Sequence, residues 1–238
     1  MDIEVQYRSA AGRTCRDEPA GLRGVPLEER QPLSEPHAYK GRPSIVTKWA
    51  AATTGQVVWC TSTVQMDAAM LLDFDADIVC FQSLVVRLHW ESEGRGGIVE
   101  PAFVARTRDG RRLVFTHPPR QGADMEERVL RQAAEEAGWE ILPFRVPQGV
   151  LRSSLEVASH FSGPEFAGDA STRRMLLDIF AAPRPLQEGA AVSGLGLRAL
   201  GYVWHLVWTG ELTCDWTKPL LPTSQVWASR LSASGKEA

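Results

Sequence analysis

Three aspartates, Asp73, Asp75 and Asp77, occupy alternating positions in the middle of the sequence. Carboxylates at this spacing are typical of calcium-binding loops, because hard cations prefer oxygen ligands. An EF-hand loop beginning at Asp73 would need glycine at its sixth position and glutamate at its twelfth, which here are Ile78 and Leu84. We therefore interpret the run as a solvated turn between a helix and a strand.

Arginines gather around a second feature, a hairpin predicted at 102–117. Its turn is Asp109-Gly110, a pair that supplies the positive φ angles of tight hairpins. Arginine neutralises phosphate, so the group could position DNA by its backbone without reading bases. The alternative is a solvated hairpin tip. The residues are Arg106, Arg108, Arg111, Arg112 and Arg120.

Other chemistries lack their motifs. The four cysteines form no C-x-x-C pair, which argues against a zinc ribbon or a disulfide framework and favours buried thiols. Phosphate-binding loops, nucleophile elbows and dinucleotide-binding glycine motifs are missing. A net charge of −3 over 238 residues excludes a generally basic nucleic-acid coat.

Nothing in the sequence predicts a membrane protein. Its longest apolar runs are far shorter than the roughly 20 residues that span a bilayer. Met1 is followed by Asp2 and Glu4 rather than by a basic and apolar leader. We expect a cytoplasmic protein without a membrane partner.

Hydrophobic periodicity predicts an α/β chain. We expect strands over 44–49, 56–60, 78–81, 85–90, 102–107, 112–117 and 139–146, with a turn at 91–97. Helices are expected over 63–73 and 124–137. Val64, Ala68, Leu71 and Leu72 should face inward on the first, and Gly138 should end the second.

Composition divides the chain into four segments. Residues 1–43, rich in proline and glycine, are expected to form an irregular arm, followed by a core domain at 44–150 and a linker at 151–170. In 171–238 we expect helices over 171–181 and 195–209 and a strand over 211–216. That order favours a small winged-helix-like domain.

Several short motifs, in order, resemble the TnsA-like endonuclease subunits of heteromeric transposases. Those motifs are Tyr39-x-Gly41-Arg42, Ala52-Thr53-Thr54-Gly55, Met70-Leu71-Leu72-Asp73-Phe74-Asp75, Leu88-His89-Trp90, Pro101-x-Phe103-x-Ala105-Arg106, Asp109-Gly110, Phe180-Ala181-x-Pro183-Arg184-Pro185-Leu186 and His205-Leu206-x-Trp208. The resemblance implies a restriction-endonuclease-like mixed-sheet core with flanking helices, followed by a winged-helix-like domain. It also implies partners: DNA, and a transposase or an ATPase-type regulator.

Such cores cleave phosphodiesters with divalent cations held by carboxylates. The family pattern places a glutamate on the first helix, an aspartate after a proline, and an acidic-x-basic triplet on the next strand. Here these positions are Gln65, Ala102 and Thr116-His117-Pro118. None of them is a carboxylate, so we expect a catalytically inactive, nuclease-like protein without a metal or other cofactor.

Two alternatives remain. An active Mg²⁺- or Mn²⁺-dependent endonuclease could use a relocated site, with Glu100 as ligand and His117 as base. If the strand reaches back to Glu100, its side chain shares a face with Ala102, whereas His117 lies opposite Thr116. The other alternative is a regulatory protein-interaction module that does not bind DNA.

Overall fold

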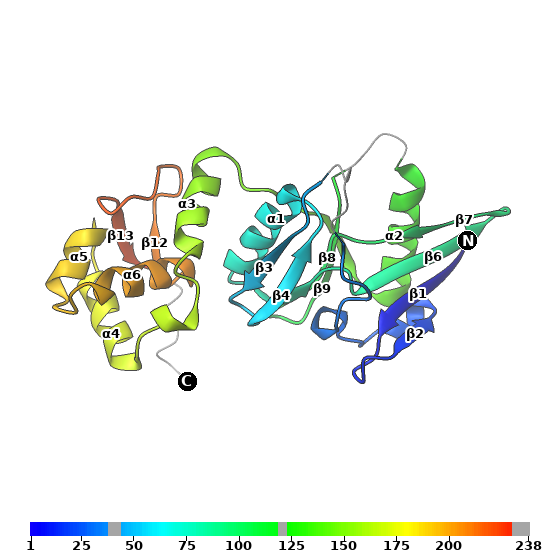
Figure 1. Cartoon of the computed structure of the whole chain (residues 1–238), viewed down its shortest axis with the longest axis horizontal. Coiled ribbons are helices and arrows are strands. Elements are labelled where there is room, and N and C mark those ends of the chain that lie inside the picture. Colours follow the sequence, from blue (N-terminus) through cyan, green and yellow to red (C-terminus); the bar gives the residue numbers. More distant parts are fainter. Residues whose placement is uncertain (38–43, 119–122, 230–238) are drawn as a thin grey trace. The chain divides into compact units, whose positions relative to one another are not determined.

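The chain folds into two compact units, Met1–Val146 and Pro147–Ala238, each with its own helices and strands (Figure 1). This computed structural model describes residues 1–37, 44–118 and 123–229. The α/β class predicted from the sequence is confirmed. Tyr39, Gly41 and Arg42 of the first motif, and Arg120 of the arginine group, lie outside the described residues.

The first unit contains ten strands and two α-helices among its described residues. They are β1 (Asp2–Arg8), β2 (Thr14–Asp17), β3 (Thr47–Ala51), β4 (Gln56–Cys60), α1 (Thr63–Phe74), β5 (Ile78–Gln82), β6 (Val86–Ser92), β7 (Arg95–Val99), β8 (Phe103–Thr107), β9 (Arg112–Thr116), α2 (Asp124–Ala137) and β10 (Glu140–Pro143). Two 3₁₀ helices, η1 (Pro19–Leu22) and η2 (Leu27–Glu29), follow β2.

A mixed four-stranded sheet, in the order β10-β9-β8-β5, forms the centre of this unit. Strands β5, β8 and β9 are antiparallel, whereas β10 runs parallel to β9 after the crossover helix α2. Alternation along the strands directs Phe103 and Phe115 toward α1, and Val104 and Val114 toward α2. The two helices therefore cover opposite faces of the sheet (Figure 1).

The expectation of an irregular arm at 1–43 was wrong for its described part. Strand β1 lies between β2 and β6 in a second sheet, β2-β1-β6-β7, and pairs Asp2 with Glu91. Val5 and Leu22 are completely buried. Proline and glycine suggested disorder, but they lie in the turns and in η1, while the partner of β1 is remote in sequence.

Two further expectations failed within this unit. Residues 91–97 form not one turn but the end of β6 and most of β7, joined at Glu93-Gly94, where both φ angles are positive. On α1, Val64 is exposed, and the buried face includes Gln65 and Asp73 instead. Polar side chains can occupy such a face when hydrogen bonds satisfy them.

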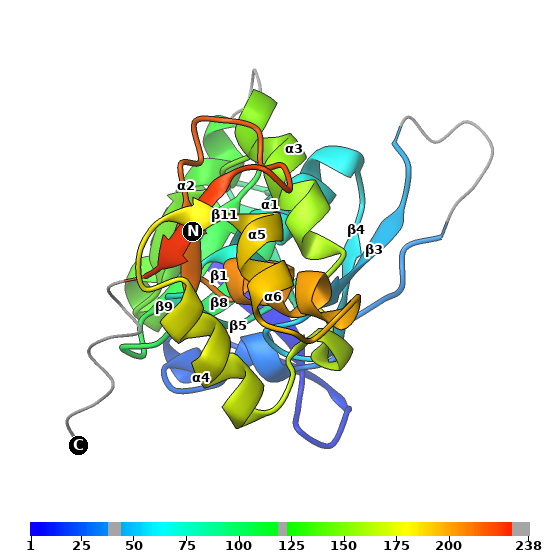
Figure 2. The same ribbon diagram turned by 90° about the vertical axis from the view of Figure 1, so that its left-hand side faces the viewer.

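The second unit contains α3 (Gly149–Ser159), η3 (Pro164–Phe166), α4 (Ala170–Ile179), β11 (Arg184–Pro185), α5 (Leu186–Val192), α6 (Arg198–Trp208), β12 (Leu212–Cys214) and β13 (Gln225–Ala228). The strands form an antiparallel sheet in the order β11-β13-β12. Helices α5 and α6 pack side by side (Figure 2). The expected linker at 151–170 is mostly helical instead, because Leu155 and Ala158 of α3 are buried in this unit.

Helix α6 is buried on most of its surface. Leu197 and Leu200 are exposed, whereas Val203, Trp204 and Val207 are buried. The helix begins only at Arg198, so Leu197 belongs to the preceding loop. Within the described residues, no helix combines the length and the apolar character needed to cross a membrane.

Candidate functional site

Gln65, which the resemblance aligns with a helix glutamate, is a buried side chain whose amide oxygen and nitrogen both form hydrogen bonds. The hydroxyl of Ser62 accepts the Gln65 backbone N–H and caps α1. The Gln65 amide oxygen accepts from the backbone N–H of Thr61 at 2.7 Å and from the Thr61 hydroxyl at 2.9 Å. Its amide nitrogen donates to the backbone carbonyl of Ala102 at 2.9 Å. With 2% exposure, the side chain is held in the protein interior.

Ala102, the second position to which the resemblance points, lies directly against Gln65 on the α1 side of the sheet. Its methyl group packs in the apolar cluster that contains Phe103 and Phe115. Its backbone N–H donates to the carbonyl of Phe115 at 2.8 Å. The fold thus brings two of the three family positions together, but they offer only a neutral amide and a methyl group.

Thr116, the third position, faces the other side of the sheet. Because Phe115 points toward α1, alternation turns Thr116 toward α2. There it lines two cavities beside Leu130 of α2. The sheet therefore separates Thr116 from the Gln65–Ala102 pair.

The relocated-site residues, Glu100 and His117, line one cavity of about 270 Å³ together with Thr116. This arrangement differs from the expectation in two ways. Strand β8 begins only at Phe103, so Glu100 is on the α2 side while Ala102 packs on the α1 side. Strand β9 ends at Thr116, so side chains no longer alternate between the two faces of the sheet at His117, and His117 lines the same cavity as Thr116.

Both residues also contact groups near the cavity. Glu100 forms an ion pair with Arg87, with 2.6 Å between Oε1 and Nη2. The His117 ring lies edge-on to Phe144, with centroids 5.9 Å apart. Glu126 and Glu127 of α2 line the cavity too. Among the described residues, however, no three His, Cys, Asp or Glu side chains lie close enough to hold a metal ion.

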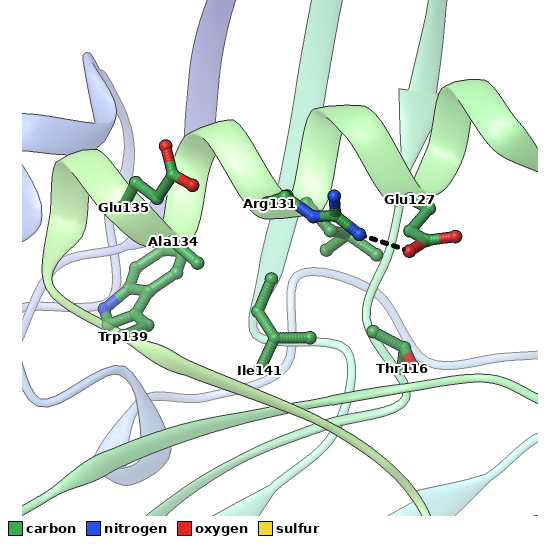
Figure 3. Close-up of a pocket in the computed structure, with 8 residues that line it drawn as sticks. Thr116, Glu127, Arg131, Ala134, Glu135, Trp139 and Ile141 are labelled. Carbon is green, nitrogen blue, oxygen red and sulfur yellow. Dashed lines mark hydrogen bonds and ion pairs between the residues drawn. The ribbon is translucent and has the colours of Figure 1, made fainter.

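A second cavity, of about 400 Å³, continues along α2 (Figure 3). It shares Thr116, Glu127, Leu130 and Ile141 with the smaller cavity. Figure 3 shows Arg131 bonded to Glu127 above Ile141. Sequence reasoning missed this space, because the residues that line it come from α2, β9 and β10 and form no local motif.

Two of the predicted arginines, Arg106 and Arg111, form ion pairs with nearby carboxylates. Arg106 contacts Glu28 at 3.3 Å and Glu29 at 2.5 Å. Burial opposes the charged form of Arg106, but these two carboxylates outweigh it and raise its pKa. Glu28 is itself buried, so the pair ties η2 to β8. Arg106 therefore has a structural role in this unit.

The remaining described arginines lie at the hairpin tip. Arg111 bonds to Asp109 and Glu140 and pairs with Asp77; the bonds to Asp109 and Glu140 raise its pKa. Arg108 donates to the carbonyl of Ala76 at 2.8 Å. Arg112 is half-buried on β9. The exposed cationic surface is much smaller than the count of arginines suggests.

The aspartate run is not a solvated turn throughout. Asp75 and Asp77 are exposed, but Asp73 is buried at the end of α1. Its carboxylate accepts from the indole N–H of Trp49 at 3.0 Å and from the backbone N–H groups of Ala52 and Thr53 at 3.0 and 2.8 Å. Asp73 therefore fastens the β3–β4 hairpin to α1.

Comparison of the chain with protein-family models and with curated proteins found no match.

Proposed function

We propose that the chain is a TnsA-like protein whose nuclease core is catalytically inactive, and that it serves as a binding subunit of a transposase-type complex. The order of elements in the first unit, α1-β5-β8-β9-α2-β10, supports a restriction-endonuclease-like core. The sheet is mixed, one helix covers each face, and the β6–β7 hairpin is inserted between β5 and β8. Gln65 lies on α1, Ala102 directly precedes β8, and Thr116 is the last residue of β9.

The hydrogen bond from Gln65 to Ala102 carries the proposal of inactivity. A divalent cation at this point would need anionic oxygens. The Gln65 oxygen is neutral and already accepts two hydrogen bonds, and Ala102 has no ligand atom in its side chain. Thr116 is a neutral hydroxyl on the other face of the sheet. These donors do not fit the metal centre that the fold family implies.

A winged-helix-like second unit is supported by its order of elements, α4-β11-α5-α6-β12-β13, and by its three-stranded antiparallel sheet. In helix-turn-helix proteins the recognition helix lies in the major groove of DNA. The corresponding α6 is covered instead: Trp204 stacks on Phe161, and the His205 ring nitrogen contacts the Phe161 carbonyl at 2.8 Å. This coverage, with the neutralised Arg106 and Arg111, favours a protein partner over DNA.

Plasmid cleavage tests the inactivity. Supercoiled plasmid incubated with the protein and Mg²⁺ or Mn²⁺ should stay intact. The double variant Gln65→Glu/Ala102→Asp supplies carboxylates at the two adjacent positions. Titration with Mn²⁺ then compares metal binding by this variant with metal binding by the wild-type protein. The proposal would be contradicted by a nicking activity that co-purifies with the wild-type protein and requires the divalent ion.

A relocated endonuclease site is the second candidate, because Glu100 and His117 line one cavity. The ion pair between Glu100 and Arg87 opposes it, since a cation would have to displace the guanidinium. Loss of a metal-dependent nicking activity in both Glu100→Ala and His117→Ala would establish this candidate.

A DNA-binding measurement separates a subunit that also contacts DNA from a regulatory module that does not. Retardation of a DNA duplex should be measured at low salt and near physiological salt. Binding through the hairpin arginines should weaken steeply with salt, because it depends on counterion release. If no retardation occurs at low salt, the chain acts through protein contacts alone.

A further inference from the structure

The two cavities beside α2 are neighbours, because Thr116, Glu127, Leu130 and Ile141 line both. We refer to the pair as the α2–β10 groove. Helix α2 forms one wall, and β10, at the edge of the central sheet, forms the other. All of its lining residues belong to the first unit.

The floor of the groove is apolar. Alternation along β10 directs Ile141 and Pro143 toward α2, in line with Trp139 just before the strand. Leu130 and Ala134 of α2 complete this floor. Such a surface favours apolar side chains over a hydrated ligand, since their burial releases ordered water.

The rim of the groove is acidic. Glu100, Glu126, Glu127 and Glu135 all line it, and Arg131 is the one cationic side chain among the described lining residues. Arg131 is bonded to Glu127, Arg87 pairs with Glu100 from outside the lining, and Glu126 also has an interaction partner. Glu135 is exposed to solvent on α2. The field of this rim repels phosphate and attracts lysine and arginine.

From this combination we propose that the α2–β10 groove binds a short segment of a protein partner in which basic and apolar side chains alternate. The apolar side chains would lie on the Trp139–Ile141 floor, and the basic ones would reach the glutamates of the rim. Complementary charge at the rim selects the partner and speeds association, whereas the apolar floor supplies most of the affinity. The inference deepens the proposed binding role and rests on it.

A designed peptide pair tests the groove. One fluorescein-labelled peptide alternates lysine with leucine, and the other alternates glutamate with leucine. We expect fluorescence polarisation to show that only the lysine peptide binds the full-length protein, with an affinity that falls as salt is added. Hydrogen exchange should slow in α2 and β10 when it binds.

Two double variants locate the contact. Glu126→Lys/Glu135→Lys reverses the rim and should weaken the lysine peptide about tenfold, because attraction becomes repulsion. Glu18→Lys/Glu188→Lys makes the same charge change at exposed positions outside the groove and should change affinity less than about twofold. Equal weakening by both variants, equal binding of both peptides, or no binding of the lysine peptide would overturn the proposal.

These outcomes are independent of the plasmid test. A wild-type protein that nicks DNA would refute the proposed inactivity even if the lysine peptide binds the groove. An inactive protein that does not bind the peptide would refute the groove and leave the inactivity standing.

Discussion

The side-chain amide of Gln65 donates a hydrogen bond to the backbone carbonyl of Ala102 and so joins the first turn of α1 to the start of β8. Under the proposed function, this internal polar contact lies where the resemblance would place a cation ligand. Gln65 itself has a structural role, because it links α1 to the residue before β8. The consequences can be measured as stability.

Gln65→Ala should destabilise the first unit by about 3 kcal/mol, because it leaves the Thr61 N–H and the Ala102 carbonyl buried without their partner. Urea denaturation followed by circular dichroism measures the change. Gln65→Glu keeps the shape of the side chain. When the glutamate is ionised, however, it has no hydrogen to donate, and its carboxylate oxygen faces the carbonyl oxygen of Ala102. Its destabilisation should therefore shrink as the pH is lowered, since a protonated carboxyl can donate. A pH-independent loss in Gln65→Glu would contradict this account.

Arg106→Ala should destabilise the protein by about 3 kcal/mol, because the buried Glu28 then loses its counter-ion. Arg108→Ala, whose guanidinium donates to a carbonyl at an exposed tip, is the matched control and should cost less than about 1 kcal/mol. Thermal unfolding compares the two. Equal effects would mean that Arg106 is not the link between η2 and β8.

Gly189→Ala should destabilise the second unit although alanine is the better helix former. A methyl group at this position of α5 would overlap the buried ring of Phe180. Overpacking of this kind costs about 1–3 kcal/mol, whereas the higher helix propensity of alanine over glycine stabilises the helix by roughly 1 kcal/mol. The double variant Phe180→Leu/Gly189→Ala should recover part of the loss if the clash is its cause. A gain in melting temperature in Gly189→Ala alone would show that the ring can move aside.

The four thiols should differ in reactivity. Burial raises the pKa of Cys60 to about 12 and of Cys214 to about 12, and burial with the nearby Glu28 raises that of Cys80 to about 11. Because the thiolate is the reactive form, these three stay protonated and slow at pH 8. Cys15 is only half-buried on β2 and should be alkylated first. Mass spectrometry after brief iodoacetamide treatment should find one modification, which Cys15→Ser removes; rapid modification of several thiols would show that the core opens easily.

Local signals predicted the central sheet well. The Asp109-Gly110 pair marks the β8–β9 hairpin, with Gly110 at a φ of +86°, and Gly138 ends α2 at a φ of +71°. Both depend on the few residues around them, which the sequence displays directly. The same locality explains why α1, β4 and β5 were placed to within a residue or two.

Features that depend on distant partners were not predicted. Nothing near β1 reveals that β6 will pair with it, and the glycines of β7 resemble a turn unless Trp90 is known to cover them. The arginine group looked available because Glu28 and Glu29 are remote in sequence. For the candidate site, the sequence shows that Gln65, Ala102 and Thr116 are not carboxylates, but it did not predict that Thr116 faces away from the other two.

The place of β1 in the middle of its sheet also affects synthesis. Strand β1 leaves the ribosome well before β6, and Asp2 must wait for Glu91 before its ladder with β6 can form. At usual translation rates that interval lasts several seconds or more. During that time the apolar Ile3 and Val5 have no sheet to cover them. A nascent chain halted before β6 should therefore be a substrate for chaperones, whereas one released after it can close the sheet.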